Sequence, residues 1–421
     1  MKRRNFLKTS ASAMIAANIT NLSCSGSTSA QDNETKEYLH QGRIPGYKDH
    51  RIIDPGLKIK KIETFSKPEV AFVRVTTDNN MQGWGQISTY NSDITSLILH
   101  RDIAHRVLGK DPANIDEIVD HCIESNLKYP WSYICRALGG VDTAIWDLYG
   151  KIKQKPVCEL LGGESKPFPV YGSSMSRSIK PEDEVKRFLK MRDEKGIKFF
   201  KFRIGTSNGR NKDAWPGRTE DMIKVIGQSL SDCSLKADGN SCYTPDKAIE
   251  VGRLMQDYHI KQFEEPCPYW ELEWTAEVAA ALDMEISGGE QDNDLAQWRR
   301  MIGMQVVDIV QPDILYVGGF TRALRVAQMA NEKGLPCIPH SANHCLITLF
   351  TLHLMRCIPN PGNSLEYSIE IDEGINKTAK DLFAPHPEIQ DGQLNMSPEP
   401  GWGVSINEEW LKSADYMVSE A

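Results

Sequence analysis

Three acidic residues recur at equal intervals in the second half of the chain. Asp238, Glu264 and Glu290 follow one another at intervals of 26 residues. Each ends a short apolar run with the composition of a β-strand, at residues 234–238, 260–264 and 284–290. A βα unit needs about this length to cross over and return parallel, so the three acids should meet at one end of neighbouring strands. Because converging carboxylates repel one another unless a hard divalent cation lies between them, the spacing predicts a metal site.

Further strand-like runs surround these three at similar spacing. They lie at residues 169–171, 199–204, 306–313, 336–340 and 364–367. Eight parallel strands of this kind close into a (β/α)8 barrel, whose active sites lie at the carboxyl ends of the strands. The pattern therefore predicts a barrel domain over residues 166–384, with the three acids at its catalytic end.

The carboxyl ends of the predicted strands are unusually polar. In chain order they carry Lys201, Arg203, Asp238, Asn240, Glu264, Glu290, Asp313, His340 and Glu366. One such residue alone is typical of a solvated turn or a helix cap, but packing does not require charge at one strand end after another. The set therefore indicates an active site.

The segments outside the barrel differ from it in pattern. Residues 57–86 alternate between apolar and polar residues in the manner of an antiparallel meander, and helical periodicity follows. We therefore expect an α+β domain over residues 57–165, preceded by a polar arm at 31–56. The Pro- and Gly-rich tail at 385–421 is expected to pack on this first domain.

The composition of the 421 residues is that of an ordinary globular protein, with 25% charged and 40% hydrophobic residues. The net charge of −8 argues against a nucleic-acid-binding face, which would be basic. The ten cysteines include no Cys-x-x-Cys pair, so neither a zinc ribbon nor a compact disulfide scaffold is indicated. No stretch is long and apolar enough to span a membrane in the mature chain.

Residues 1–30 have the features of an export signal. The pair Arg3-Arg4 precedes a weakly apolar stretch at 11–19, which predicts a twin-arginine signal cleaved after Ala30. The alternatives are a basic, solvated helix and a lipid-modified Cys24. We therefore expect a periplasmic protein exported by the twin-arginine route, or a membrane-anchored lipoprotein if Cys24 is lipidated.

The order and strand positions of nine motifs resemble those of the enolase superfamily, in its mandelate racemase/muconate lactonizing enzyme-like branch. The motifs are residues 140–151, 156–163, 201–203, 238–240, 264–266, 289–290, 311–313, 339–340 and 365–367. The resemblance covers about residue 57 to the end. It implies a (β/α)7β-type modified TIM barrel with an N-terminal α+β capping domain that the C-terminal tail completes. It also implies a small carboxylate substrate, one Mg²⁺ per subunit and a homo-oligomer.

By match to these motifs, the resemblance implies that Asp238, Glu264 and Glu290 hold the Mg²⁺ ion, while Glu265 points away. The metal holds a substrate carboxylate, and a base then removes the neighbouring α-proton. In this family, loops of the first domain choose the substrate. The aromatic and basic residues available there are Tyr47, Lys48, Trp84, Tyr90 and Trp131.

The resemblance also implies the base. His340 matches the family's histidine, and Asp313 matches the acid that orients it. A carboxylate bound to one ring nitrogen raises the basicity of the other. His344, four residues further on, is the competing candidate. Glu366 matches a residue that donates a hydrogen bond to the substrate carboxylate, which requires a protonated carboxyl. Asn240 is expected to contact the substrate as well.

The sequence departs from the family on the second barrel strand. Many relatives have Lys-x-Lys there, whereas this chain has Lys201 and Arg203. Arginine stays protonated and is a poor base. A racemase needs a base on each face of the α-carbon, so this change disfavours racemisation. Lys201 remains either a second base or, with Arg203, a residue that binds the substrate carboxylate.

We therefore predict an enzyme, a Mg²⁺-dependent hydro-lyase that dehydrates an aldonate or aldarate to a 2-keto-3-deoxy acid. A single His340–Asp313 dyad suffices for this reaction. The first alternative is a racemase, epimerase or cycloisomerase that acts on a hydroxy or sugar acid through the same enediolate. The alternative of another class is a secreted, non-catalytic binding protein that kept the barrel but lost turnover.

Overall fold

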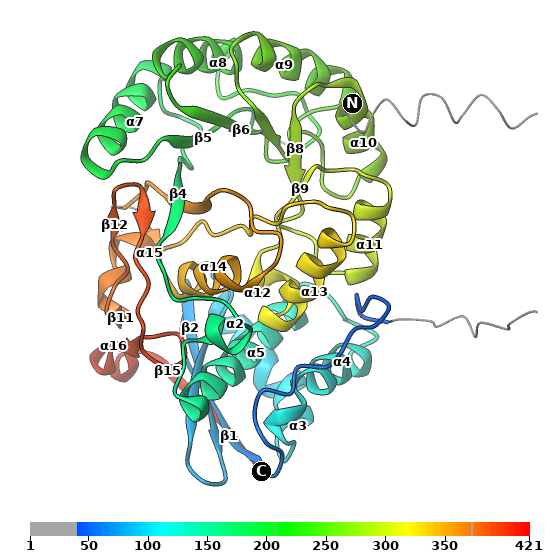
Figure 1. The fold of residues 1–421 in the computed structure, drawn as a ribbon, viewed down its shortest axis with the longest axis vertical. Helices are drawn as coiled ribbons and strands as arrows, with labels where there is room; N and C mark the ends of the chain where they lie inside the picture. Colours follow the sequence, from blue (N-terminus) through cyan, green and yellow to red (C-terminus); the bar gives the residue numbers. More distant parts are fainter. Residues whose placement is uncertain (1–39, 207, 372–373) are drawn as a thin grey trace, which may run out of the picture. The chain divides into compact units, whose positions relative to one another are not determined.

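The computed structural model describes residues 40–206, 208–371 and 374–421. The predicted export signal, with Cys24 and Ala30, lies outside these residues, and so does the first part of the predicted arm. Gln41–Ala421 forms one unit, in which an N-terminal domain is joined to a barrel (Figure 1).

The N-terminal domain is built on a four-stranded antiparallel sheet in the order β15-β1-β2-β3. Strands β1 (Ile59–Lys67), β2 (Val70–Thr77) and β3 (Gln82–Ile87) form the meander expected from the alternating pattern. The fourth strand, β15 (Asp415–Glu420), pairs antiparallel with β1. The C-terminal tail therefore completes the sheet of the first domain.

Helices cover this sheet and connect it to the barrel. They are α2 (Ser92–Ile98), the π-helical turn η1 (Leu99–Ile103), α3 (Ala104–Val107), the 3-10 turn η2 (Pro112–Asn114), α4 (Ile115–Ser125), α5 (Tyr133–Lys153) and α6 (Val157–Leu160). The middle of α5 is fully buried because β3 packs on one side and barrel helices on the other. Asp142 of α5 accepts backbone hydrogen bonds from Phe320 (2.5 Å) and Thr321 (3.3 Å) of the barrel.

The barrel alternates strands and helices along the chain. Its elements are β4 (Phe168–Ser173), α7 (Pro181–Lys195), β5 (Phe199–Arg203), α8 (Arg218–Ser229), β6 (Ser234–Asp238), α9 (Pro245–Asp257), β7 (Gln262–Glu264), α10 (Leu272–Ala281), β8 (Glu285–Gly288), α11 (Leu295–Gly303), β9 (Ile309–Val310), α12 (Ile314–Val317), α13 (Phe320–Asn331), α14 (Leu346–Cys357) and β10 (Leu365–Ser368). Neighbouring strands from β4 to β9 are parallel, and β10 pairs parallel with β4. Helices α7 to α11 follow one another around the outside of these strands (Figure 1).

The seventh predicted strand is not a regular strand. Residues 336–340 make isolated parallel bridges instead, in which Cys337 pairs with Val310 and with Pro361, and His340 pairs with Asp313. Pro336 and Pro339 lack the N–H groups that a continuous ladder needs. These bridges still connect β9 to the segment before β10, so His340 stays at the carboxyl end of the barrel.

The C-terminal tail contacts both domains. After α15 (Gly374–Lys377) and the 3-10 turn η3 (Ala379–Asp381) come short strands and one helix: β11 (Phe383–Ala384), β12 (Ile389–Gln390), β13 (Gln393–Leu394), β14 (Ser405–Ile406) and α16 (Glu408–Lys412). Strand β13 pairs antiparallel with β4 of the barrel, whereas β15 pairs with β1. The buried Trp402 donates its indole N–H to the Thr143 carbonyl of α5 at 2.9 Å.

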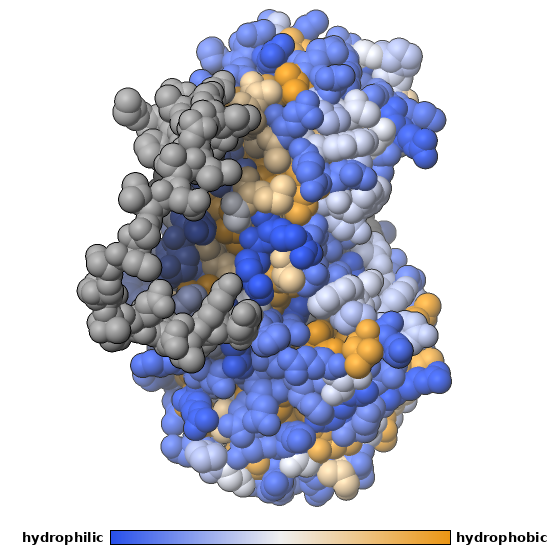
Figure 2. Space-filling view, turned by 90° about the vertical axis from the view of Figure 1, so that its right-hand side faces the viewer, coloured by the Kyte–Doolittle hydropathy of each residue, from blue (hydrophilic) through white to orange (hydrophobic). Residues whose placement is uncertain are grey.

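The described part of the face in Figure 2 is mostly hydrophilic, with hydrophobic residues in separate patches. No helix within the described residues is long and apolar enough to cross a membrane.

The contact between β3 and α5 generates a stability prediction. Gly85 lies directly against α5, and a Cβ added there would overlap the Gly140 carbonyl oxygen. We expect Gly85→Ala to lower the free energy of unfolding by about 3 kcal/mol. The added methyl group would meet backbone atoms of α5, which cannot move aside as a flexible side chain could. Urea denaturation measures this. Gly303→Ala, where an added Cβ meets open space, is the control; equal stability of the two variants would contradict the prediction.

Candidate active site

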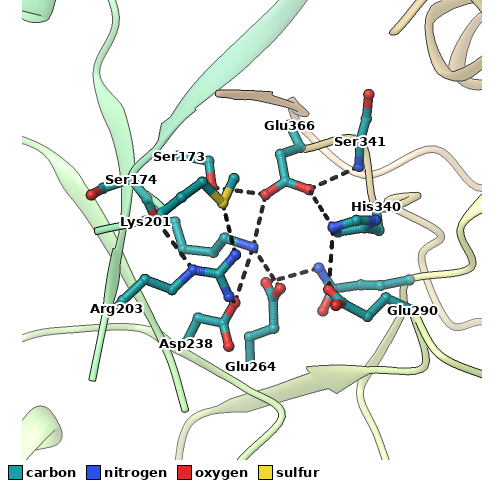
Figure 3. Close-up of polar contacts among 12 residues, drawn as sticks. Ser173, Ser174, Lys201, Arg203, Asp238, Glu264, Glu290, His340, Ser341 and Glu366 are labelled. Atoms are coloured by element: carbon teal, nitrogen blue, oxygen red, sulfur yellow. Dashed lines mark hydrogen bonds and ion pairs between the residues drawn. The ribbon is translucent and has the colours of Figure 1, made fainter. Parts of the chain in front are cut away.

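A cavity of about 460 Å³ opens at the carboxyl ends of the barrel strands. Four predicted site residues line it: Arg203, Asn240, Glu290 and His340. The other five are buried around it: Lys201, Asp238, Glu264, Asp313 and Glu366. Figure 3 shows the charged members of this set other than Asp313 pointing toward one another from different strands.

The ammonium group of Lys201 is the centre of this charge network (Figure 3). Its Nζ lies 2.5 Å from Glu264 Oε1, 2.9 Å from Glu366 Oε1 and 3.4 Å from Asp238 Oδ2. Burial disfavours the charged lysine, but Glu264 and Glu366 raise its pKa well above the usual value. Lys201 is therefore held as an ammonium ion, which disfavours its alternative role as a base.

Arg203 is paired with Asp238. Its guanidinium contacts the Asp238 carboxylate and also donates to the Ser174 carbonyl oxygen at 3.3 Å. Burial alone would lower the pKa of Arg203, but the nearby Asp238 carboxylate raises it to a net value above the usual range. In turn, burial raises the pKa of Asp238, and Arg203 and Lys201 lower it to a net value below the usual range. Arg203 is therefore a fixed cation, as its residue type predicts.

Glu264 is a buried carboxyl whose negative charge Lys201 offsets only in part. Burial raises its pKa to about 7, with Asp238 adding to the effect although Lys201 opposes it. The Gln311 side chain donates to Glu264 Oε2 at 3.0 Å. A carboxyl with a pKa this high gains from any further cation that lies close to it.

The predicted metal ligands come from adjacent strands: Asp238 ends β6, Glu264 ends β7, and Glu290 follows β8 by two residues. In the part of the chain that the structure describes, no three His, Cys, Asp or Glu side chains are arranged to enclose an ion. Two of the acids are paired with Lys201 and Arg203 instead. The donor set is nevertheless the one Mg²⁺ prefers, and Glu290 Oε2 is buried without a hydrogen-bond partner. The three acids therefore fit Mg²⁺ by their chemistry.

His340 and Asp313 form the expected pair. His340 Nδ1 lies 2.8 Å from Asp313 Oδ2. Asp313 Oδ1 accepts the backbone N–H groups of Leu315 (2.8 Å) and Tyr316 (3.0 Å) at the start of α12. A carboxylate fixed in this way holds the Nδ1 proton of a neutral ring and leaves Nε2 free. His340 Nε2 is 3.4 Å from Glu290 Oε2.

The protonation of the two histidines differs. Burial lowers the pKa of His340, but Glu290, Glu366 and Asp313 raise it to a net value of about 10. His340 is therefore an imidazolium, protonated on both ring nitrogens, at neutral pH in this arrangement. His344 is not among the described residues that line the cavity: its Nε2 lies 2.8 Å from the Ser368 carbonyl oxygen, and burial lowers its pKa to about 4. This geometry favours His340 over His344.

Glu366 is ionised in this arrangement, whereas the predicted hydrogen bond to a substrate carboxylate requires the protonated form. Burial raises its pKa, but Lys201 and His340 lower it to a net value well below the usual range. The carboxylate accepts hydrogen bonds from Ser173 Oγ (2.7 Å) and from the backbone N–H of Ser341 (2.9 Å). Glu366 is therefore an ionised acceptor because Lys201 lies beside it, a contact that its position in the sequence does not reveal.

The cavity also contains residues that sequence reasoning missed. Glu69 from the turn between β1 and β2, Arg177 from the loop after β4, and Tyr316 from α12 line it. Glu69 and Arg177 lie in a turn and a loop, which follow no periodicity, and Tyr316 lies in the four-residue helix α12, which is too short to show one. Of the residues expected from the first domain, Tyr90 lines the cavity, but the lining does not include Tyr47, Lys48, Trp84 or Trp131.

Two family models match the chain. The model "Mandelate racemase / muconate lactonizing enzyme, N-terminal domain" matches residues 51–162. The model "Enolase C-terminal domain-like" matches residues 183–410. The matched ranges together cover the N-terminal domain and most of the barrel.

Individual proteins are similar over most of their length. The arabinonate dehydratase of Saccharolobus solfataricus is 28% identical over 347 residues, which are 81% of this chain and 89% of the relative. The crystal structure of a putative racemase from Roseobacter denitrificans is 52% identical with a TM-score of 0.84, covering 86% of this chain and 100% of that one. A mandelate racemase/muconate lactonizing protein from Paracoccus denitrificans, complexed with magnesium, is 26% identical with a TM-score of 0.78, covering 87% and 99%.

The charge network around Lys201 generates a prediction on stability. We expect Lys201→Met to lower the free energy of unfolding by roughly 3–5 kcal/mol because it leaves buried carboxylates without their cation. Urea denaturation of the purified protein measures the change. Lys186→Met on the exposed side of α7 is the matched control and should leave the unfolding midpoint unchanged. A Lys201 variant as stable as this control would refute the central role of the ammonium group.

Proposed function

The chain belongs to the enolase superfamily, in its mandelate racemase/muconate lactonizing enzyme branch, and we propose that it is a Mg²⁺-dependent sugar-acid dehydratase. In this proposal it removes the proton α to a substrate carboxylate and eliminates the β-hydroxyl as water. The observation that carries the proposal is the His340–Asp313 pair beside Glu290 in one cavity. The other two acids of metal-binding type, Asp238 and Glu264, are buried around this cavity.

Asp238, Glu264 and Glu290 would hold the Mg²⁺ ion. When bound, the ion would act as a Lewis acid that polarises the substrate carboxylate and makes the α-proton acidic. Two observations on the chain itself support these ligands: the raised pKa of Glu264, and the Oε2 of Glu290, which is buried without a hydrogen-bond partner although His340 Nε2 lies 3.4 Å away. The magnesium in the Paracoccus relative is consistent with them.

His340 would move the proton. Positive charge held by Glu290 would offset the negative charge that raises the pKa of His340 and so make the neutral ring available. With Nδ1–H held by Asp313, Nε2 of this neutral ring would accept the α-proton as the C–H bond breaks. The imidazolium then donates this proton to the β-hydroxyl, the C–O bond breaks, and water leaves. The enol product tautomerises to a 2-keto-3-deoxy acid. The acids around His340 that raise its pKa stabilise the imidazolium that forms in the first step.

Lys201, Arg203, Asn240 and Glu366 would bind and orient the substrate. Lys201 and Arg203 are permanent cations here, so they suit a carboxylate and its developing negative charge. As an ionised acceptor, Glu366 suits a substrate hydroxyl or the Lys201 ammonium better than it suits a second carboxylate.

A racemase, epimerase or cycloisomerase is the second candidate. It is favoured by the similarity to the Roseobacter protein, a putative racemase that is 52% identical to this chain. The protonated state of Lys201 and the presence of Arg203 argue against it, because racemisation needs a second proton acceptor on the opposite face. Dehydration remains the better-supported reaction.

We also propose that the protein is exported by the twin-arginine route and acts in the periplasm, as a lipoprotein if Cys24 is modified. The Arg3-Arg4 pair and the apolar stretch after it support export. A homo-oligomeric assembly is proposed from family membership alone.

The proposed reaction predicts a product. Incubation with Mg²⁺ and a panel of aldonic and aldaric acids in D₂O should yield a 2-keto-3-deoxy acid, measured by NMR. His340→Asn should lower kcat by roughly 10²–10⁴-fold because it removes the proton carrier.

His259→Asn is the matched control, since this exposed histidine lies at the opposite end of the barrel, just before β7. Deuterium exchange at the α-carbon without loss of water would contradict dehydration and identify the reaction as racemisation. Full turnover by His340→Asn would contradict the assignment of His340 as the base.

The proposed metal site predicts a contrast between two glutamates near one strand. Chelation by EDTA should abolish turnover, and Mg²⁺ should restore it. Glu290→Gln should weaken Mg²⁺ binding, measured by calorimetry, at least about tenfold because it removes one anionic ligand. Glu285→Gln, at the exposed start of β8, is the control. Equal Mg²⁺ affinity of both variants would exclude Glu290 as a ligand.

A further inference from the structure

Arg177 is a cationic residue of the cavity that the proposed reaction does not use. It lies four residues beyond the end of β4, in the loop that leads to α7, and lines the same cavity as His340. Arg177 is partly exposed, whereas Lys201 and Glu366 are fully buried. Arg177 is therefore nearer the mouth than the groups proposed to act on the reacting end of the substrate.

Hydrogen bonds fix the loop that carries Arg177. The buried guanidinium of Arg218 donates to three backbone carbonyl oxygens, those of Arg203 (3.0 Å), Ile179 (3.3 Å) and Ser176 (3.4 Å). On the other side, the Glu370 carboxylate accepts the backbone N–H of Met175 at 3.0 Å. The loop is therefore held in place before a ligand binds, which lowers the entropy cost of binding.

The guanidinium of Arg177 has no carboxylate within ion-pair distance among the described residues. Its hydrogen bond runs to the neutral side-chain oxygen of Asn240, at 2.5 Å. Asn240 is in turn oriented by donating to Glu265 at 3.1 Å. The neighbouring cation Arg203 is already paired with Asp238. Since a guanidinium has five N–H donors, Arg177 keeps donors and charge available for a ligand.

The rest of the lining combines charged residues with neutral hydrogen-bonding ones. The charged residues among the described lining residues are Arg177, Arg203, His340, Glu69, Glu290 and Glu370. Glu370 is itself paired with Arg187. The capping domain contributes Thr89 and Tyr90, and the loops near His340 and β10 contribute Asn343 and Asn376. Side chains of this type suit the hydroxyl groups of a sugar chain that extends between its two ends.

We propose that Arg177 binds a second carboxylate of the substrate, remote from the carbon that loses its proton, so that aldarates are the preferred substrates. This inference rests on the proposed function and narrows its substrate class. A planar guanidinium binds a carboxylate through two parallel N–H···O bonds. Its single charge also matches that of one carboxylate, whereas a phosphate ester would leave negative charge unbalanced.

Matched acid pairs test the inference. Galactarate and galactonate, and the corresponding gluco and manno pairs, have the same carbon chain and differ in the oxidation state of the last carbon. For the accepted configuration, kcat/KM of the wild type should favour the aldarate by roughly 10- to 100-fold. Arg177→Gln should bring this ratio close to one, mainly through KM for the aldarate. Arg177→Lys should restore part of the ratio, since it keeps the charge but loses the two-bond geometry.

Arg253→Gln, on the exposed face of α9, is the matched control and should keep the wild-type ratio. A wild type without preference for aldarates, or an Arg177→Gln variant that keeps the preference, would overturn the inference. An equal loss of kcat/KM for the aldarate and the aldonate in Arg177→Gln would also overturn the inference. In that case Arg177 would only balance the charge of nearby carboxylate side chains.

Calorimetry separates this inference from the proposed function. Absence of turnover with every acid refutes the dehydratase proposal, while the affinity ratio for galactarate over galactonate, measured on wild type and Arg177→Gln, still decides the role of Arg177. An affinity ratio that Arg177→Gln lowers about tenfold supports the second carboxylate, and an unchanged ratio rejects it.

Discussion

The positive charge of Lys201 inside the barrel is the interaction on which the rest of the site depends. Its ammonium group contacts Asp238, Glu264 and Glu366, which come from β6, β7 and β10. Strand β10 pairs with β4, so these contacts span the point at which the barrel closes. Buried carboxylates gathered without such a cation would repel one another and the strands that carry them. The network is therefore a structural element as well as a chemical one.

The same negative charge sets the chemistry of the dyad. Glu290, Glu366 and Asp313 stabilise the imidazolium of His340, so the ring holds its proton tightly in this arrangement and gives it up reluctantly. How much positive charge lies beside these acids therefore decides which form of the ring is available. The protonation of His340 therefore depends on whether a cation is bound beside it. Binding of the cation together with the substrate carboxylate would prepare the ring for catalysis.

The parts of this arrangement that follow from repeated spacing could be predicted from the sequence. Equal intervals between Asp238, Glu264 and Glu290 indicated parallel strands and a shared end, and the resemblance to the family indicated the dyad. His340 was located correctly although its segment is not a regular strand, because the bridges of Cys337 keep it in line with its neighbours. The ionised state of Glu366 depends on a contact with Lys201 across the barrel, and the position of Arg177 depends on a loop held by tertiary hydrogen bonds. Neither of these two features produces a periodic pattern in the sequence.

The pairing of β15 with β1 has a consequence for how the protein is made. These strands are adjacent in one sheet, yet nearly the whole chain separates them. Contacts of such high sequence separation form late, since a long loop must close first. During synthesis, one edge of β1 is therefore left open until residues 415–420 have emerged, and an open edge is a template for pairing with other chains. Loss of the final strand would leave the barrel residues intact while making the capping sheet prone to aggregation.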